Sequence, residues 1–234
     1  EVVLIPLFDI GSTGFKKFSE GADLMETLGI FKYEPPEQIV QLPGGKRIVQ
    51  KQNLNFNKYY KFPNHKNTPH MFNTEDEVVV TRKVHGTNAR FGIVKKSRLS
   101  LWDRVKQLFG YQVEYEYVIG SHNVIKTYSK DGGFYNDNVW AECSVKYGIE
   151  SKCWEIFHKI KETSPDLLGT GFIIYGEIYG EGIQGQHYTY GLKGRELVVF
   201  DIELNKQYLN REELNDFMYE LELPEVDMLY RGKW

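Results

Sequence analysis

The sequence has few cysteines, no long apolar run and no internal repeat. Two cysteines in 234 residues, Cys143 and Cys153, form neither a disulfide framework nor a zinc knuckle, and they favour a reducing, intracellular compartment. The longest apolar run, near the N-terminus, is broken by Pro6 and falls short of the roughly 18–20 residues that a membrane span needs. No basic stretch precedes it, so a secretory signal is not expected. We therefore expect no membrane partner; whether the setting is cytoplasmic, nuclear or phage-encoded stays open.

What is present is a globular composition with an uneven distribution of charge. Hydrophobic residues make up 41%, charged residues 26% and aromatic residues 15%, which excludes disordered and collagen-like chains. Residues 41–130 hold 16 Lys and Arg against 6 Asp and Glu, so the remainder holds 13 against 26. A segment this basic is typical of a surface for a polyanion such as nucleic acid. A solvated basic face balanced by acidic helices explains the same numbers, and charge alone does not separate the two.

Strand and helix patterns alternate irregularly, which predicts an α+β fold of mainly antiparallel sheets with inserted helices. We expect Gly86 to form a turn between two neighbouring strands, and Ser151 and Asn210 each to cap a helix. Pro35 and Pro36 indicate a linker. The expected strands are residues 77–83, 87–94, 115–121, 171–180 and 196–204, and the expected helices are residues 101–110, 137–148, 151–164 and 210–221.

The most informative stretch is TRKVHGTNAR, residues 81–90. It places Lys83 at the end of a predicted strand, with Gly86 three residues further on, where the backbone of a ligand can approach closely. Lysine is a poor nucleophile at its ordinary pKa of about 10.4, so covalent chemistry requires burial, neighbouring positive charge or a metal to remove its proton. A lysine followed by a glycine is common, and a solvated strand lysine with a turn glycine fits these few residues equally well.

A longer pattern favours the chemical interpretation. KVHGTNARFG, from Lys83, closely resembles motif I of ATP-dependent RNA ligases of the T4 RNA ligase 2 type, which belong to the covalent nucleotidyltransferase superfamily. YVIGSHNV resembles motif Ia of that family, GFIIYGEIYGEGIQ its motif III and ELVVFDIEL its motif IIIa, all in family order. The resemblance implies a nucleotidyltransferase domain over residues 37–234. Because LGIFKYEPP resembles the junction after an OB-like domain, residues 1–36 are expected to be the end of such a domain plus a linker.

The resemblance assigns roles to the residues of motif I. Lys83 would attack the α-phosphorus of ATP to give a lysyl-AMP intermediate and pyrophosphate. His85 would assist the later nucleic-acid steps, although a hydrogen-bonded turn histidine is the alternative. Gly86 would give backbone access to the nucleotide, and Asn88 an amide donor for phosphate or sugar oxygens. The cofactors implied are ATP and Mg²⁺ or Mn²⁺.

The later motifs add further expected contacts. In motif Ia, Ser121 and His122 would contact phosphate, although His122 replaces the usual arginine, and Asn123 would hold a metal-bound water. In motif III, Glu177 would bind the ribose hydroxyls or the water shell of the metal. Phe200 in motif IIIa would stack on adenine, unless it is an ordinary core residue. Two further residues, Gln184 and Tyr190, are also candidates for the site.

Two departures from the family pattern qualify this interpretation. Arg82 stands where the family has glutamate, which leaves the choice between ATP and GTP open. Motifs IV and V are expected beyond Trp234, so the domain is expected to be incomplete at its C-terminus and its activity impaired.

The expected function is sealing of 3′-hydroxyl and 5′-phosphate ends or nicks in RNA or an RNA-containing duplex. The alternatives are a non-catalytic or degenerate RNA-binding module, or a DNA ligase or GTP-using capping enzyme. The oligomeric state is open, and a monomer is assumed.

Overall fold

The computed structural model describes residues 40–41, 47–48, 53–110, 114–126, 138–184 and 190–234. The chain divides into two units, residues 1–50 and 51–234. In the first unit, the described residues form two antiparallel strands, β1 (Val40–Gln41) and β2 (Arg47–Ile48). The predicted OB-like segment, residues 1–36, lies outside the described residues.

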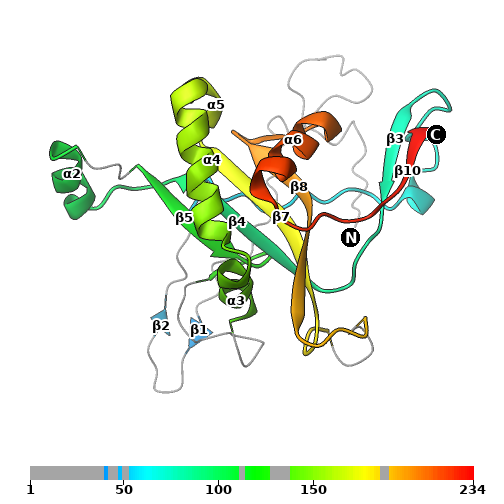
Figure 1. Cartoon of the computed structure of the whole chain (residues 1–234), viewed down its shortest axis with the longest axis horizontal. Helices are drawn as coiled ribbons and strands as arrows, with labels where there is room; N and C mark the ends of the chain where they lie inside the picture. Colours follow the sequence, from blue (N-terminus) through cyan, green and yellow to red (C-terminus); the bar gives the residue numbers. More distant parts are fainter. Residues whose placement is uncertain (1–39, 42–46, 49–52, 111–113, 127–137, 185–189) are drawn as a thin grey trace, which may run out of the picture. The chain divides into compact units, whose positions relative to one another are not determined.

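The second unit is built on a six-stranded antiparallel sheet in the order β6-β5-β4-β7-β8-β9 (Figure 1). Strands β4, β7 and β8 form its centre and are the longest, as their apolar, β-branched sequences predict. The α+β prediction with mainly antiparallel sheets is confirmed. The strands are β4 (Thr87–Lys95), β5 (Tyr115–Gly120), β6 (Ile125–Lys126), β7 (Gly171–Gly180), β8 (Arg195–Leu204) and β9 (Gln207–Tyr208).

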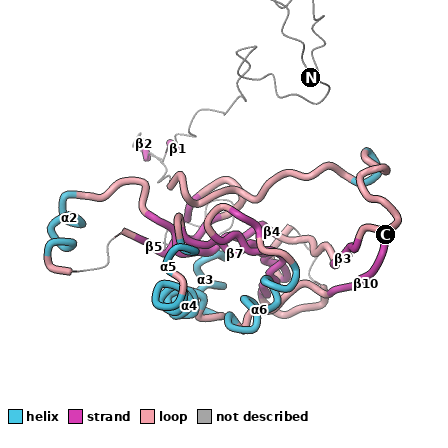
Figure 2. The backbone as a smooth tube through the Cα atoms, turned by 90° about the horizontal axis from the view of Figure 1, so that it is seen from above, coloured by secondary structure: helices cyan, strands magenta, loops and turns pink. Residues whose placement is uncertain are grey.

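Helices α3 to α6 cover one face of this sheet, and Figure 2 shows them gathered on the same side of the strands, with α2 lying apart. Side chains alternate along each strand, so Phe91 and Ile174 point into the helical core while Val94 and Tyr175 belong to a smaller cluster on the opposite face. That opposite face also carries the polar residue Glu177, two positions after Tyr175. The helices are α2 (Leu101–Leu108), α3 (Val139–Lys146), α4 (Ile149–Thr163), α5 (Pro165–Leu168) and α6 (Arg211–Leu221), with a 3₁₀ turn η2 (His65–Asn67).

One predicted helix cap is confirmed and the other is wrong. Asn210 accepts a hydrogen bond from the Glu213 amide at 3.0 Å, and the Glu213 carboxylate accepts from the Asn210 amide, which completes a capping box for α6. By contrast, α4 begins at Ile149, so Ser151 lies inside the helix and its hydroxyl donates to the carbonyl of Gly148. Gly148, at φ +61°, separates α3 from α4 and leaves no room for a cap at Ser151.

The expected turn at Gly86 is also wrong. Strand β3 (Glu77–Thr81) does not pair with β4 but forms a separate ribbon with β10 (Met228–Lys233). Gly86 is nevertheless required, because a Cβ there would lie 2.1 Å from the carbonyl oxygen of Ile178. The absence of a side chain lets the segment after β3 press against β7.

Candidate active site

The segment between β3 and β4 lies against motif III. Strand β3 ends at Thr81, so Lys83 lies in the connection rather than in the strand, and its side chain is exposed. The amide of Gly86 donates a hydrogen bond to Glu177 Oε1 at 3.0 Å. The positive charge of Lys83 acts on the same carboxyl group. The structure thus brings Lys83, Gly86 and Glu177 together from segments about ninety positions apart in the sequence.

Glu177 is a carboxyl group in an unusual environment. It sits on β7 between the buried residues Gly176 and Ile178, and burial raises its pKa to about 7. The Gly86 hydrogen bond and the Lys83 charge act in the opposite direction, but burial dominates. Near neutral pH the protonated and ionised forms of Glu177 are therefore both populated. A cation bound beside it would favour the carboxylate.

The raised pKa of Glu177 predicts a pH-dependent effect of Glu177→Gln on stability. The folded protein holds this proton more tightly than the unfolded chain does, so wild-type stability from this group is full below pH 4.5 and is lost as pH rises through 7. Because glutamine stays neutral, we expect the variant to gain on wild type between these values, by at most about 3 kcal/mol above pH 7. Urea unfolding at pH 4, 6 and 8 measures this; a difference that does not change with pH contradicts the assignment.

Asn88 lies beside Glu177 on the neighbouring strand. The two residues are register partners across β4 and β7, so their side chains share a face. The Oδ1 atom of Asn88 is buried and accepts no hydrogen bond from a described residue. A buried acceptor without a partner is unfavourable, so Asn88 is a candidate contact for a bound ligand.

Gln184 and Tyr190 also reach the motif I segment. Gln184 Nε2 donates to the carbonyl of Gly86 at 2.9 Å, and the amide of His85 donates to the hydroxyl of Tyr190 at 2.8 Å. Both Gln184 and Tyr190 have positive φ angles, 53° and 54°, which side-chain-bearing residues seldom adopt. Such strained residues cluster at functional sites, where the surrounding contacts hold them in place. His85 itself is exposed.

Motif Ia lies on the other side of β4. Ser121 and His122 follow β5 directly, and Asn123 is exposed at the turn closed by the Ser121 amide and the Val124 carbonyl. Burial lowers the pKa of His122, and the positive charges of Arg90, Lys58 and Lys61 lower it further. His122 is therefore mainly neutral near pH 7, inside a cationic environment that suits a phosphate.

Arg90 organises this part of the site, although no prediction from the sequence included it. Its guanidinium donates to the carbonyls of Phe56 and Asn57 at 2.9 and 2.7 Å and to that of Ser121 at 2.8 Å, and it lies over the Phe56 ring. Burial lowers its pKa to about 10. Its position two residues after Asn88 on the same face, roughly 7 Å along the strand, was the available signal. Arg90 thereby holds motif Ia and the segment around Phe56 beside the Asn88–Glu177 pair.

Phe200 and Arg82 have partners within the protein. Tyr175 pairs with Asp201 and Gly176 with Val199, which leaves Phe200 as the extra residue of a bulge. The Phe200 ring is half-buried against Tyr59, with ring centres 5.0 Å apart. Arg82 forms an exposed ion pair with Asp227 at 3.0 Å, and its amide donates to the Asp227 carbonyl. Motif I is thus tied to the segment before β10.

The oxygen ligands near Glu177 suit a metal ion that keeps most of its water shell rather than one coordinated entirely by protein side chains. Among the residues that the structure describes, no group of three or more His, Cys, Asp or Glu side chains is placed to hold a metal directly. Glu177 would supply a carboxylate oxygen, and Asn88, with its buried Oδ1 atom, lies opposite it in the strand register. Mg²⁺ and Mn²⁺ accept oxygen ligands, and Mg²⁺ commonly uses one or two carboxylates while water and substrate phosphates complete its shell.

The α+β domain that carries this candidate site has known relatives. The family model of RNA ligases matches residues 76–234, and the chain belongs to that family. No curated protein matches the chain. None of the helices within the described ranges is both long and apolar enough to cross a bilayer.

Solved structures of an RNA ligase from Naegleria gruberi share the fold. The complex with PPi superimposes with a TM-score of 0.56 at 19% identity, covering 91% of this chain and 53% of that one. A mutant of the same enzyme with ATP and Mn gives 0.56 at 20% identity with the same coverage. A mutant with AMP and Mn gives 0.53 at 19% identity, covering 97% and 56%. The chain spans about half the length of these relatives.

Proposed function

We propose that this chain carries the nucleotidyltransferase domain of an ATP-dependent RNA ligase of the T4 RNA ligase 2 type, with Lys83 as the nucleophile. The observation that carries the proposal is the hydrogen bond from Gly86 to Glu177, which joins motif I to motif III beside Lys83. Membership of the RNA ligase family and the relatives solved with ATP, AMP and Mn support it. In this proposal residues 1–36 are the end of an OB-like domain and its linker, and residues 37–234 are the nucleotidyltransferase domain.

The first chemical step forms one bond and breaks another. The Lys83 amine, having lost its proton, attacks the α-phosphorus of ATP; a phosphorus–nitrogen bond forms and the bond to the β-phosphate oxygen breaks, releasing pyrophosphate. Glu177 would bind the ribose hydroxyls or, with Asn123, would hold a hydrated divalent cation, which would supply positive charge against the phosphates. Gly86 and Asn88 contact the nucleotide, and Phe200 borders the adenine from the bulge of β8. Arg82 borders the nucleotide from its place before Lys83.

RNA would then approach along the cationic face beside motif Ia. Lys58 and Lys61 are exposed in a segment that also carries exposed Tyr60 and Phe62, and their charges act on His122. Cationic side chains interleaved with aromatic rings bind single strands by phosphate neutralisation and base stacking. Ser121 and His122 would contact the 5′-phosphate, to which AMP is transferred from the lysine. The 3′-hydroxyl then attacks that phosphate, so that a phosphodiester bond forms, the bond to AMP breaks and AMP is released.

Intact-mass measurement after incubation with ATP and Mg²⁺ or Mn²⁺ tests this function. We expect the mass to increase by one adenylyl group, and GTP in place of ATP separates a ligase from a capping-type enzyme. A second arm supplies an adenylylated RNA nick, whose sealing does not require the triphosphate. If both arms fail while RNA binding is salt-dependent, the chain is a non-catalytic binding module and the proposal is wrong.

The role assigned to His85 predicts a difference between the steps of the reaction. Its amide is fixed by Tyr190 while its side chain is exposed next to the proposed nucleophile, so the imidazole can reach a nucleic-acid phosphate. We expect His85→Ala to lower sealing of an adenylylated nick by about 100-fold, the size of a general acid–base contribution, and to affect self-adenylylation much less. Single-turnover rates for the two steps measure this. Equal losses in both would contradict the role.

A further inference from the structure

Helix α2 projects from the second unit with an uncovered apolar side. It lies in the connection between β4 and β5, apart from the helices that cover the sheet (Figures 1 and 2). None of its residues is buried; Trp102 is 76% exposed and Leu108 86%. The helix is well formed despite this, because Ser100 and Asp103 make a capping box. Its exposure therefore belongs to a folded helix rather than to a frayed end.

The apolar residues of α2 form a stripe with cationic borders. At 100° per residue, Leu101, Trp102, Val105 and Leu108 fall within an arc of about 120°. Arg104 and Lys106 lie about 40° beyond either edge of this arc. Asp103, the acidic residue of the helix, lies on the opposite side, where it pairs with Lys96 at 2.9 Å. The stripe is thus apolar and flanked by two positive charges.

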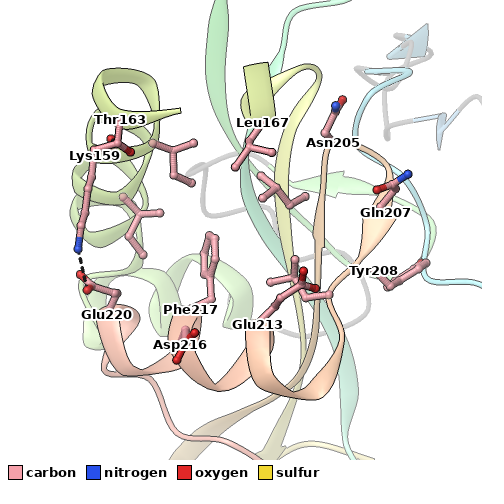
Figure 3. Close-up of a pocket in the computed structure, with 14 residues that line it drawn as sticks. Lys159, Thr163, Leu167, Asn205, Gln207, Tyr208, Glu213, Asp216, Phe217 and Glu220 are labelled. Atoms are coloured by element: carbon pink, nitrogen blue, oxygen red, sulfur yellow. Dashed lines mark hydrogen bonds and ion pairs between the residues drawn. The ribbon is translucent and has the colours of Figure 1, made fainter. Parts of the chain in front are cut away.

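An apolar groove with acidic residues on one wall lies between α4, α5, α6 and the turn from β8 to β9 (Figure 3). Its volume is about 480 Å³, and apolar side chains such as Leu167 and Phe217 line it. Three carboxylates also line it, on Glu213, Asp216 and Glu220, all from α6. Lys159, a cation among the described lining residues, is paired with Glu220 at 2.7 Å. The groove is apolar inside and acidic along one wall.

The helix and the groove match in length, and one cationic border of the helix matches the acidic wall of the groove. The lining residues run from Ile156 to Thr163 along α4 and from Glu213 to Glu220 along α6, about 10 Å along each axis. Helix α2, with eight residues, is about 12 Å long. An amphipathic helix binds such grooves through side chains one turn apart, which is the spacing of Leu101, Val105 and Leu108.

We infer that α2 of one copy of this chain docks into the α4–α6 groove of a second copy. Because Arg104 and Lys106 border opposite sides of the stripe, one of them then faces the carboxylates of α6 and the other lies along α4, while Trp102 and Leu108 enter the apolar interior. The two surfaces differ, so the contact is heterologous, and each bound copy still presents a free groove or a free helix. Association therefore either closes into a ring or continues into longer chains. The face that carries Glu177 lies on the other side of the sheet and is not used.

Sedimentation velocity of the full chain over a range of concentrations tests the inference, using two variants changed only at exposed positions. The helix variant carries Trp102→Glu and Leu108→Glu; the groove variant carries Leu167→Lys and Asp216→Lys. We expect wild type to associate and each variant alone to associate at least tenfold more weakly. Mixing the two should restore a 1:1 complex, because the intact helix of one variant fits the intact groove of the other.

Matched controls and rival contacts give distinct results. Gln107→Glu, on the polar side of α2, and Asn215→Lys, on α6 outside the groove, should associate like wild type. A groove variant that still self-associates indicates α2–α2 pairing and overturns the inference. A wild-type chain that stays monomeric also overturns it; binding to phosphatidylserine vesicles would then assign the stripe to a lipid surface. Circular dichroism confirms that each variant is folded.

Discussion

Lys83→Ala is expected to abolish the covalent adenylyl adduct. Under the proposed function the Lys83 amine forms the phosphorus–nitrogen bond, and the charge of this lysine acts on Glu177 within the contact between motifs I and III. Loss of the nucleophile removes the step entirely, so labelling with ATP should fall at least a thousandfold, of the order seen when a catalytic nucleophile is deleted. Intact-mass spectrometry of the denatured and desalted protein, which removes non-covalent nucleotide, provides the measurement.

Lys95→Ala is the matched control for this result. Lys95 is an exposed lysine at the far end of β4, and its removal changes the charge by the same amount without touching the site. The control should label like wild type. Retained labelling of Lys83→Ala would refute the nucleophile assignment, and ATP binding measured in the same variant would show whether the nucleotide site survives.

Of the substitutions proposed for this protein, Arg90→Met is expected to lower the free energy of unfolding most. The substitution leaves the carbonyls of Phe56, Asn57 and Ser121 without their donor, and each buried unpaired group costs about 1–3 kcal/mol. Methionine fills part of the space and removes the cost of burying a charge, so we expect a net loss of about 3 kcal/mol rather than the full sum. Urea unfolding at pH 7 measures the change.

Arg98→Met separates this effect from a general loss of positive charge. Arg98 is exposed after β4, and its replacement should change the free energy of unfolding by less than about 0.5 kcal/mol. Arg90→Lys keeps the charge but reaches fewer carbonyls, so it should fall between the two. If Arg90→Met is as stable as wild type, the three hydrogen bonds do not hold the Phe56 segment to motif Ia.

The sheet and its helices could be predicted because their signals are local. Strands β4, β7 and β8 have continuous apolar, β-branched sequences, and Asn210 with Glu213 forms a capping box within four residues. The pairing of β3 with β10 could not be predicted, since it joins segments about 150 residues apart and no turn fixes the register. The sequence around Gly86 indicates a turn because only its local neighbours are visible there. The glycine is in fact required by the Ile178 carbonyl, which lies on another strand.

The sequence names several residues of the candidate site, but it does not show how they contact one another. Motif residues Lys83, Gly86 and Glu177 were named from the sequence, and the structure brings them together. The role of Arg90 was missed because its partners are backbone carbonyls, which leave no mark in a sequence. The bulge at Phe200 was missed because a register shift depends on both strands.

The ribbon of β3 and β10 ties the segment before Lys83 to the last strand of the described chain. Thr81 is paired with Met228, and Arg82 is held to Asp227 by both backbone and side chain, immediately before Lys83. Under the proposed function, the position of the amine therefore depends on a strand that carries none of the proposed site residues. A change that separates residues 228–233 from β3 should therefore displace the proposed nucleophile without altering any proposed site residue.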